Sequence, residues 1–336
     1  MEKFFKEDHR LSEQEQEEKV EPTETFINGV LVPEIFKNYP EVRVGVASKA
    51  MLAGQERSRA ARIMGDPKRF HNPVSTQEMG RRIGAARMIK DVLSVIYPES
   101  SADKELLRNV IKLKIVHGDN VMVIDGKFVE EMRSGLTQKS EKSQIEADAC
   151  LTNLENVPLL IPAADCVPVV FYDQVGKVIG VAHSGRRGIF KNISVKVIKK
   201  MEEVYGSNPK DLLVYLGPHA GFGPTLSRES SYEVDREVYE EFVNSRRPDD
   251  SRRFSPAEIE TMFKPNPSQP GHYFFDQGKA IYYSLLSAGV SKENIQISAY
   301  STMANNDLFS SERKEGPTAR GTFFVVAGLA DLKSAK

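Results

Sequence analysis

The sequence predicts one α/β (α+β) domain, and three observations support this fold class. Apolar runs of strand length are concentrated in the centre of the chain, apolar stripes at helical spacing lie between them, and no repeat of solenoid period is visible. With 336 residues, of which 40% are hydrophobic and 28% charged, the chain has the composition of a globular protein with a sizeable core. Its formal net charge of -1 provides no bulk attraction to nucleic acid or to an anionic membrane, so small molecules are the expected partners.

The folded domain is expected to occupy residues 25–332. Residues 1–24 are dense in Glu, Lys and Gln and bury little, which predicts a charged, solvated tail. Short apolar runs between Thr25 and Ser48 predict the first strands. An apolar stripe between Gln77 and Ile96 predicts a helix that packs on a sheet.

Strand-like runs dominate the centre of the chain. They read VHGDNVMVID at 116–125, PLLIPA at 158–163, VPVVFYD at 167–173 and KVIGVAHS at 177–184, and we expect them to lie deep in one sheet. Immediately afterwards, apolar residues recur at spacings of three and four and predict one helix that ends near Gly206. Its buried face is expected to comprise Ile189, Ile193, Val197, Met201 and Val204.

The last third of the chain returns to alternating strands and helices. The pattern predicts a strand over 211–217, a helix over 234–243, a helix over 276–288, and strands over 294–300 and 322–328. The polar stretch at 244–271 predicts an exposed insertion.

Cysteine usage and the lack of targeting signals favour a cytoplasmic protein. Cys150 and Cys166 are the only two cysteines, too few for a disulfide framework, and Cys150 lies within an apolar run that predicts a core position. The N-terminus contains no apolar core of signal-peptide length, and no stretch approaches the roughly 20 apolar residues that span a bilayer.

Three residues of metal-binding type follow strand-like runs. Cys166 lies in Ala-Ala-Asp-Cys-Val-Pro between two apolar runs, where a turn presents its side chain at the end of a sheet. His183 ends one run immediately before the predicted helix, and His117 ends the run IKLKIVH. Gly118 then lets the backbone approach a bound ion closely. We expect the three side chains to converge on one site.

A thiolate and two imidazoles together form a donor set suited to Zn²⁺, and a fourth position left to water would make such a site catalytic. The three residues lack the tight spacing of a CxxC or HExxH motif, so their types alone do not decide between chemistries. In the metal-free alternative, Cys166 is a thiolate nucleophile, His183 or His117 is its base, and the substrate is an amide or an ester.

Several basic side chains could bind an anion near this site. Arg187 precedes Gly188 at the predicted start of a helix, where free backbone N–H groups favour phosphate. Arg313 and Arg320 flank a Gly-Pro turn and could reach the opening of the same site. His219 either lines the pocket or caps its loop.

Several short motifs occur along the centre and the last third of the chain. The most specific are V-H-G at 116–118, A-D-A-C-L-T at 147–152, A-D-C-V-P at 164–168 and H-S-G-R-R-G at 183–188. They are followed by L-G-P at 216–218, Y-E-V at 232–234, F-S-S-E-R at 309–313 and T-A-R at 318–320. These motifs, in this order, resemble those of the laccase-domain (polyphenol oxidase, YfiH-like) family.

The resemblance implies a zinc site on His117, Cys166 and His183 in a layered α/β/β/α sandwich related to the catalytic domain of cytotoxic necrotizing factor. It also implies an enzyme that uses phosphate to split adenosine, inosine or 5′-methylthioadenosine into free base and ribose 1-phosphate, and that deaminates adenosine. Copper is less expected than zinc, because a laccase needs several copper ions and more histidine than the six residues present.

The substrate wall departs from the family pattern. Arg186 stands where the family usually has Trp, and Ile115 stands where it often has Gln. Lys49 is the nearest counterpart of an Arg that holds phosphate, and we expect it to bind substrate together with Arg187 and Arg320. Asp165, next to Cys166, either forms hydrogen bonds with the ligand or with groups around the metal ligands, or has a structural role in the turn. These departures also motivate a third hypothesis, a degenerate nucleoside-binding protein without catalysis.

Overall fold

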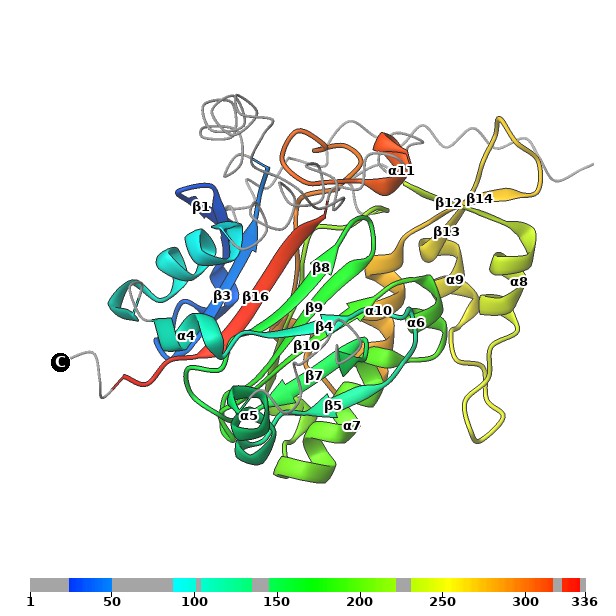
Figure 1. Cartoon of the computed structure of the whole chain (residues 1–336). Helices are drawn as coiled ribbons and strands as arrows, with labels where there is room; N and C mark the ends of the chain where they lie inside the picture. The colour runs from blue at the N-terminus through cyan, green and yellow to red at the C-terminus, as the bar shows by residue number, and fades with distance from the viewer. Residues whose placement is uncertain are drawn as a thin grey trace, which may run out of the picture.

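Two β-sheets lie face to face, and helices cover the outer face of each (Figure 1). The computed structural model describes residues 24–49, 87–100, 104–134, 145–221, 231–316 and 322–332. Within these ranges the layers follow the order α/β/β/α, which confirms the fold class predicted from the sequence.

The first sheet contains seven described strands in the order β1-β2-β3-β16-β8-β4-β6. Their bounds are β1 Glu24–Ile27, β2 Val30–Pro33, β3 Val42–Ala47, β16 Phe323–Leu329, β8 Leu159–Ala163, β4 Ile111–Lys114 and β6 Ile145–Glu146. The outer face packs on the helix at 87–96 and on α4 (Lys104–Arg108) through Val92, Ile96 and Leu106. The expected helix over 77–96 is therefore confirmed from residue 87 onward, and its first ten residues lie outside the described ranges.

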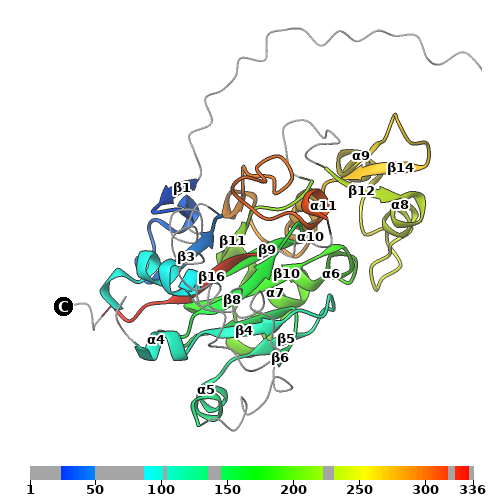
Figure 2. The ribbon, with the colours of Figure 1, turned by 45° about the horizontal axis from the view of Figure 1, so that its top comes forward.

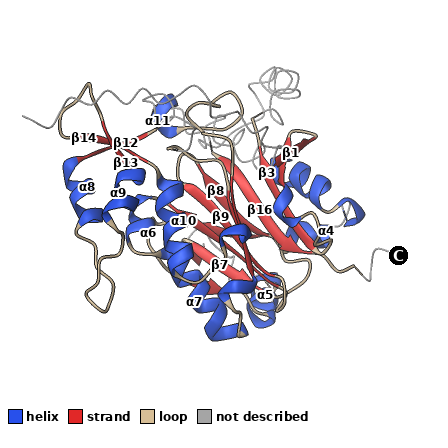
Figure 3. Cartoon of the chain, turned by 180° about the vertical axis from the view of Figure 1, so that it is seen from behind, coloured by secondary structure: helices blue, strands red, loops and turns tan. Residues whose placement is uncertain are grey.

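The second sheet contains six described strands in the order β15-β11-β9-β10-β7-β5. Their bounds are β15 Ile295–Ile297, β11 Leu212–Leu216, β9 Val167–Asp173, β10 Val178–Ser184, β7 Ala149–Thr152 and β5 Val121–Val123. The outer face is covered by α7 (Ile193–Tyr205) and α10 (Gln277–Ser287), which lie across it in the rear view (Figure 3). The short helix α6 (Arg186–Phe190) completes this layer through Ile189, whereas α5 (Gly126–Arg133) packs on the core between the two sheets through Val129 and Met132. The short helix α11 (Glu312–Glu315) lies in the connection from β15 to β16 and has no buried residue.

Strand β9 shows why both faces of each of the two packed sheets are apolar. Val170 and Tyr172 point into the core between the two sheets, whereas Val167, Val169 and Phe171 point outward to the helices. All seven residues of the strand are buried. Because successive side chains point to opposite faces, a strand covered on both sides carries apolar residues on both faces.

Two sequence predictions about connectivity are wrong. The strand at 159–163 belongs to the seven-stranded sheet, whereas the strands at 167–173 and 178–184 belong to the six-stranded sheet, so these runs do not share one sheet. The single helix predicted after Gly188 is in fact two helices, α6 and α7. Asn192 adopts a left-handed φ of 62° between them, and this conformation interrupts the helix. Val204, expected on the buried face, is 44% exposed.

A small three-stranded sheet, β12-β14-β13, extends beyond one side of the six-stranded sheet (Figure 2). Its strands are β12 Tyr232–Asp235, β14 His272–Phe275 and β13 Phe263–Pro265, and it packs with α8 (Arg236–Val243) and α9 (Pro256–Met262). The exposed insertion predicted at 244–271 is therefore wrong in its middle part, since Phe254, Ile259, Met262 and Phe263 belong to the core. Polar residues surround these few apolar positions, so the stretch looks polar on average although it contributes to the core.

Candidate active site

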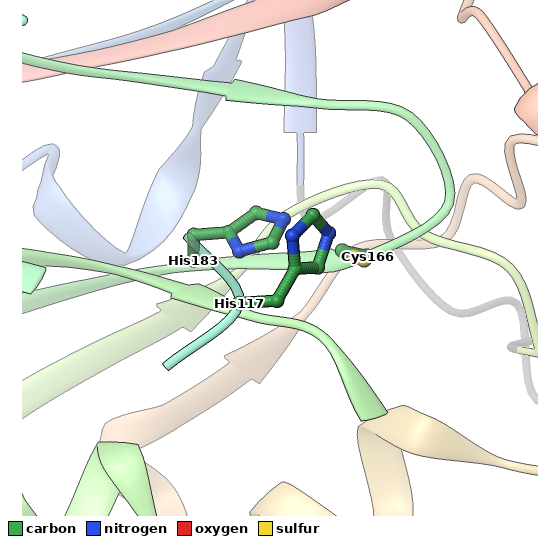
Figure 4. Close-up of side chains that lie close together, drawn as sticks. All are labelled: His117, Cys166 and His183. Carbon is green, nitrogen blue, oxygen red and sulfur yellow. The ribbon is translucent and has the colours of Figure 1, made fainter. Parts of the chain in front are cut away.

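His117, Cys166 and His183 come together at one end of the two sheets (Figure 4). His117 follows β4 of the seven-stranded sheet and precedes β5 of the six-stranded sheet. Cys166 connects β8 to β9 in the same way, from one sheet to the other, and His183 lies on β10 beside β9. The site therefore forms where the chain crosses between the sheets.

The three side chains could hold one metal ion. A nitrogen of each imidazole and the sulfur of Cys166 all lie within 4.8 Å of one another, and the imidazole rings are perpendicular, with centroids 5.0 Å apart. Ligands at about 2.0–2.3 Å from a tetrahedral zinc ion are separated by roughly 3.5 Å, so even the most widely separated pair of donors needs to close by only about an ångström. Three protein ligands leave a fourth position for water or substrate. The donor chemistry thus fits the metal that the sequence predicts.

Asp148 connects the two histidines, and the sequence analysis did not identify it as a site residue. It lies in a third crossover, between β6 and β7, and its side chain is completely buried. Its Oδ1 accepts a hydrogen bond from the backbone N–H of His117 at 2.9 Å and lies 3.3 Å from Nδ1 of His183. Its Oδ2 accepts from the N–H of Gly118 at 2.7 Å. A carboxylate on Nδ1 leaves Nε2 of His183 as the metal-binding nitrogen.

The contacts of Asp148 also explain the backbone of His117, which has a left-handed φ of 56°. A residue with a β-carbon adopts this conformation only when its surroundings enforce it. Here one carboxylate accepts the N–H groups of His117 and Gly118 together. The position of Asp148 inside the motif A-D-A-C-L-T was the only signal of its role in the sequence.

Hydrogen bonds within the site favour the charged forms of Cys166, His183 and Asp148. Burial acts to raise the pKa of the Cys166 thiol, but hydrogen bonds with His117 and His183 outweigh it and lower that pKa to about 7. Burial acts to lower the pKa of His183, but hydrogen bonds with Asp148 and with the Cys166 sulfur raise it to about 9. Burial opposes ionisation of Asp148 as well, yet hydrogen bonds from His183, Gly118 and His117 lower its pKa. These hydrogen bonds therefore favour the thiolate form of Cys166, the form in which cysteine binds a metal ion.

Gly185 packs directly against the side chains of His117, Cys166 and His183. A β-carbon at this position would lie 2.9 Å from Sγ of Cys166, 3.4 Å from Cε1 of His183 and 3.5 Å from Cδ2 of His117. Its φ of -75° suits any residue, so the requirement for glycine comes from the triad and not from the backbone.

Gly185→Ala is expected to lower the affinity of the site for a metal ion, measured with zinc as the probe, by about tenfold or more, because its methyl group must displace the sulfur or a ring. Chelator competition measures the affinity, and thermal unfolding measures stability. Gly126→Ala is the matched control, since a β-carbon there meets no atom within 4 Å. A Gly185→Ala protein with wild-type zinc affinity would contradict the steric argument.

The predicted substrate residues occupy different environments. Lys49 forms an ion pair with Glu315 at 2.5 Å and donates to the carbonyl of Asn306 at 2.6 Å. Arg187 is exposed in the first turn of the short helix α6. Asp165 is buried and hydrogen-bonded to neighbouring segments. Arg320 lies outside the described residues.

The neighbouring residues singled out in the sequence also have defined contacts. Arg313 stacks on the ring of Tyr232 at 3.7 Å and donates to the carbonyl of Glu233 at 2.8 Å. His219 is fully buried, and its Nδ1 lies 2.8 Å from the carbonyl of Gly217. Arg186, which replaces an aromatic residue of the family pattern, lies 3.6 Å from the carboxylate of Glu241 on α8. Cys150 lies in the core, as predicted.

Comparison with known proteins places the chain in a family. The profile of the family described as multi-copper polyphenol oxidoreductase laccase matches residues 99–329, which include all four residues of the site. The chain belongs to this family. Within the described part of the chain, His117, Cys166 and His183 form the one cluster of His, Cys, Asp or Glu side chains that could hold a metal ion.

Proteins similar to this chain include the purine nucleoside phosphorylase YlmD of Bacillus subtilis, 32% identical over 179 residues. The match covers 53% of this chain and 58% of that protein. A purine nucleoside phosphorylase of Rickettsia conorii is 28% identical over 207 residues, covering 62% of this chain and 71% of the relative. The chain therefore spans less than two thirds of the Bacillus relative's length.

The fold of the chain is similar to that in the crystal structure of the hypothetical protein YfiH of Bacillus licheniformis. That structure superposes with a TM-score of 0.66 at 21% identity, covering 90% of this chain and 97% of the other. Among the described residues, no helix has the length and apolar character needed to cross a membrane.

Proposed function

We propose that the protein is a zinc-dependent purine nucleoside phosphorylase. The observation that carries the proposal is the convergence of His117, Cys166 and His183 on one ion-sized position, in a family whose relatives include proteins named purine nucleoside phosphorylase. The substrates would be phosphate and adenosine, inosine or 5′-methylthioadenosine, and the products a free base and ribose 1-phosphate. Adenosine deamination would be a second activity of the same site. The cytoplasm, where thiols stay reduced, would suit the free thiolate of Cys166.

The donor set suits a single zinc ion better than it suits the several copper ions of a laccase. The single described cluster offers one thiolate and two imidazoles, whereas a laccase needs several copper ions. When bound, zinc would supply a Lewis acid that orients and polarises an oxygen of the substrate or of the attacking group. His117, Cys166 and His183 would hold it.

The chain's own residues would bind and orient the reactants. In phosphorolysis a phosphate oxygen forms a bond to C1′ of the ribose while the glycosidic bond breaks, and the electron pair leaves with the base. Arg187, exposed beside the site, would offset the charge of the phosphate, and Arg320 and Lys49 are further candidates. Lys49 would need to give up its ion pair with Glu315 to do so. Asp148 would hold the imidazole of His183 and the backbone of His117 in the arrangement that lets both residues bind the metal.

A nucleoside panel tests the proposal. Zinc-loaded protein is incubated with adenosine, inosine and 5′-methylthioadenosine, with and without phosphate, and products are separated by chromatography. We expect free base only when phosphate is present, and inosine from adenosine in either case. Protein treated with a chelator is the control and should form neither product.

Two outcomes would favour the alternatives to this proposal. Full turnover of an amide or ester substrate by metal-free protein, with rapid alkylation of Cys166, would favour the hydrolase, for which the lowered pKa of the thiol is the supporting observation. Nucleoside binding without any product would favour the non-catalytic binder, motivated by Arg186 in place of an aromatic residue.

A further inference from the structure

Asp165 ties four separate segments together at the residue next to Cys166. Its Oδ1 accepts a hydrogen bond from the hydroxyl of Thr302 at 2.6 Å, and its Oδ2 accepts from the backbone N–H of Arg313 at 2.8 Å. Its carbonyl oxygen accepts from the N–H of Ala220 at 3.0 Å and from Nε2 of Gln277 at 3.2 Å. Its side chain is only 3% exposed.

The donors come from distant parts of the chain. Thr302 and Arg313 belong to the connection from β15 in the six-stranded sheet to β16 in the seven-stranded sheet. Ala220 follows β11, and Gln277 begins α10. Asp165 therefore links its own crossover, between β8 and β9, to another crossover and to the helical layer.

The backbone of Asp165 shows what these bonds maintain. Its φ is 81°, in the left-handed region that residues with a β-carbon rarely adopt. From Val167 onward the chain is fixed in β9, which pairs with β10 and β11 on its two sides. The direction of the Cys166 side chain therefore depends on the turn at Asp165, and a relaxed turn would point the sulfur elsewhere.

We propose that Asp165 is a positioning residue that aims the Cys166 sulfur at the shared ion position. This inference deepens the proposed function by assigning a task within the same site, and it rests on the metal role of Cys166. The burial of the side chain favours a positioning role over contact with substrate, because both carboxylate oxygens already accept hydrogen bonds from the protein.

The test compares Asp165→Ala with Asp165→Asn. Alanine removes both side-chain bonds and disfavours the left-handed turn. Asparagine tolerates that turn, and its amide can accept from Arg313 N–H while donating to the hydroxyl oxygen of Thr302. Zinc affinity is measured by chelator competition, and cobalt-substituted protein reports the sulfur–metal bond through its thiolate absorption band.

The matched control is Asp173→Ala, at the opposite end of strand β9. Asp173 is 2% exposed and accepts two backbone N–H bonds, from Val175 and Gly176, each at 2.9 Å. This variant loses a comparable buried carboxylate without touching Cys166. It should lower the thermal unfolding temperature while leaving zinc affinity and the cobalt band unchanged.

We expect Asp165→Ala to bind zinc about 10 to 100 times more weakly and to lose intensity in the thiolate band, and Asp165→Asn to restore most of both. Should the alanine variant not fold, Thr302→Val takes its place: it removes one donor and should weaken zinc binding severalfold, whereas Thr302→Ser should not. Wild-type zinc affinity in Asp165→Ala or in Thr302→Val, or an equal loss in Asp173→Ala, would overturn the proposal.

The outcomes for Asp165 and for the proposed function are separable. Wild-type protein that binds zinc but splits no nucleoside would refute the phosphorylase and leave the positioning role intact. Asp165→Ala with unchanged zinc affinity, in a protein whose wild type is an active phosphorylase, would refute the positioning role alone.

Discussion

Replacing Cys166 with alanine is expected to lower kcat/KM for nucleoside phosphorolysis by about a thousandfold or more. The variant loses the single sulfur donor of the triad, and a metal contributes several kcal/mol to stabilising a transition state, with about 1.4 kcal/mol for each factor of ten in rate. Zinc content per protein, measured after dialysis, should fall in parallel. Activity and metal content are compared on the same preparation.

Cys150→Ala provides the control for this experiment. Cys150 is the other cysteine of the chain and lies in the core of β7, fully buried. Its replacement should lower stability and leave zinc content unchanged. Phosphorolysis by Cys166→Ala at the wild-type rate would exclude the site described above, whereas a loss of activity with zinc still fully bound would indicate a nucleophilic role for the thiolate.

Asp148→Asn is expected to weaken zinc binding by about 10 to 100 times, although asparagine has nearly the same shape. The three groups that face Asp148 are all donors: the N–H groups of His117 and Gly118, and Nδ1 of His183 when Nε2 binds metal. An amide presents one oxygen and one NH₂ group, so at least one donor meets another donor. The unsatisfied buried group should also reduce the free energy of unfolding by about 1–3 kcal/mol, measured by urea denaturation.

Asp173→Asn separates the loss of zinc affinity from the loss of stability. It changes a buried aspartate whose side chain accepts backbone hydrogen bonds in a turn at the other end of strand β9 from Cys166. It should reduce stability without reducing zinc affinity. The pH dependence of the free energy of unfolding gives a second check, because in the folded protein hydrogen bonds from His183, Gly118 and His117 outweigh the effect of burial and hold the pKa of Asp148 below its ordinary value. The stabilisation from its ionised form is complete well above that value and is lost as the pH falls through the lower folded pKa. Equal zinc affinity in Asp148→Asn and wild type would show that the carboxylate does not orient the ligands.

The contrast between Asp148 and Asp165 illustrates a limit of motif reading. Both residues precede buried strands within family motifs, and only Asp165 was singled out, because it is next to Cys166. The structure gives Asp148 the direct contacts with His117 and His183, and it gives Asp165 contacts with Thr302 and Arg313. Hydrogen-bond partners 31 to 148 residues away leave no local pattern by which they could be assigned.

The sequence also did not predict which strands belong to which of the two sheets. Strands β8 and β9 are separated by three residues and are both almost wholly buried, so their apolar runs look alike. A strand buried on both faces lacks the alternation that marks which face is solvent. Adjacent runs therefore predicted one sheet, although the chain changes sheets at Cys166.

By itself, the sequence determined the fold class, the family motifs and the three residues whose donor atoms suit a metal, because these depend on residue type and local periodicity. Only the tertiary structure decided that His117, Cys166 and Asp148 lie on crossovers between two sheets and so meet beside His183. It also decided that Gly185 must lack a side chain. The physical reason is that convergence depends on contacts between segments distant in the chain, which β-sheet pairing and packing set and no single stretch of sequence encodes.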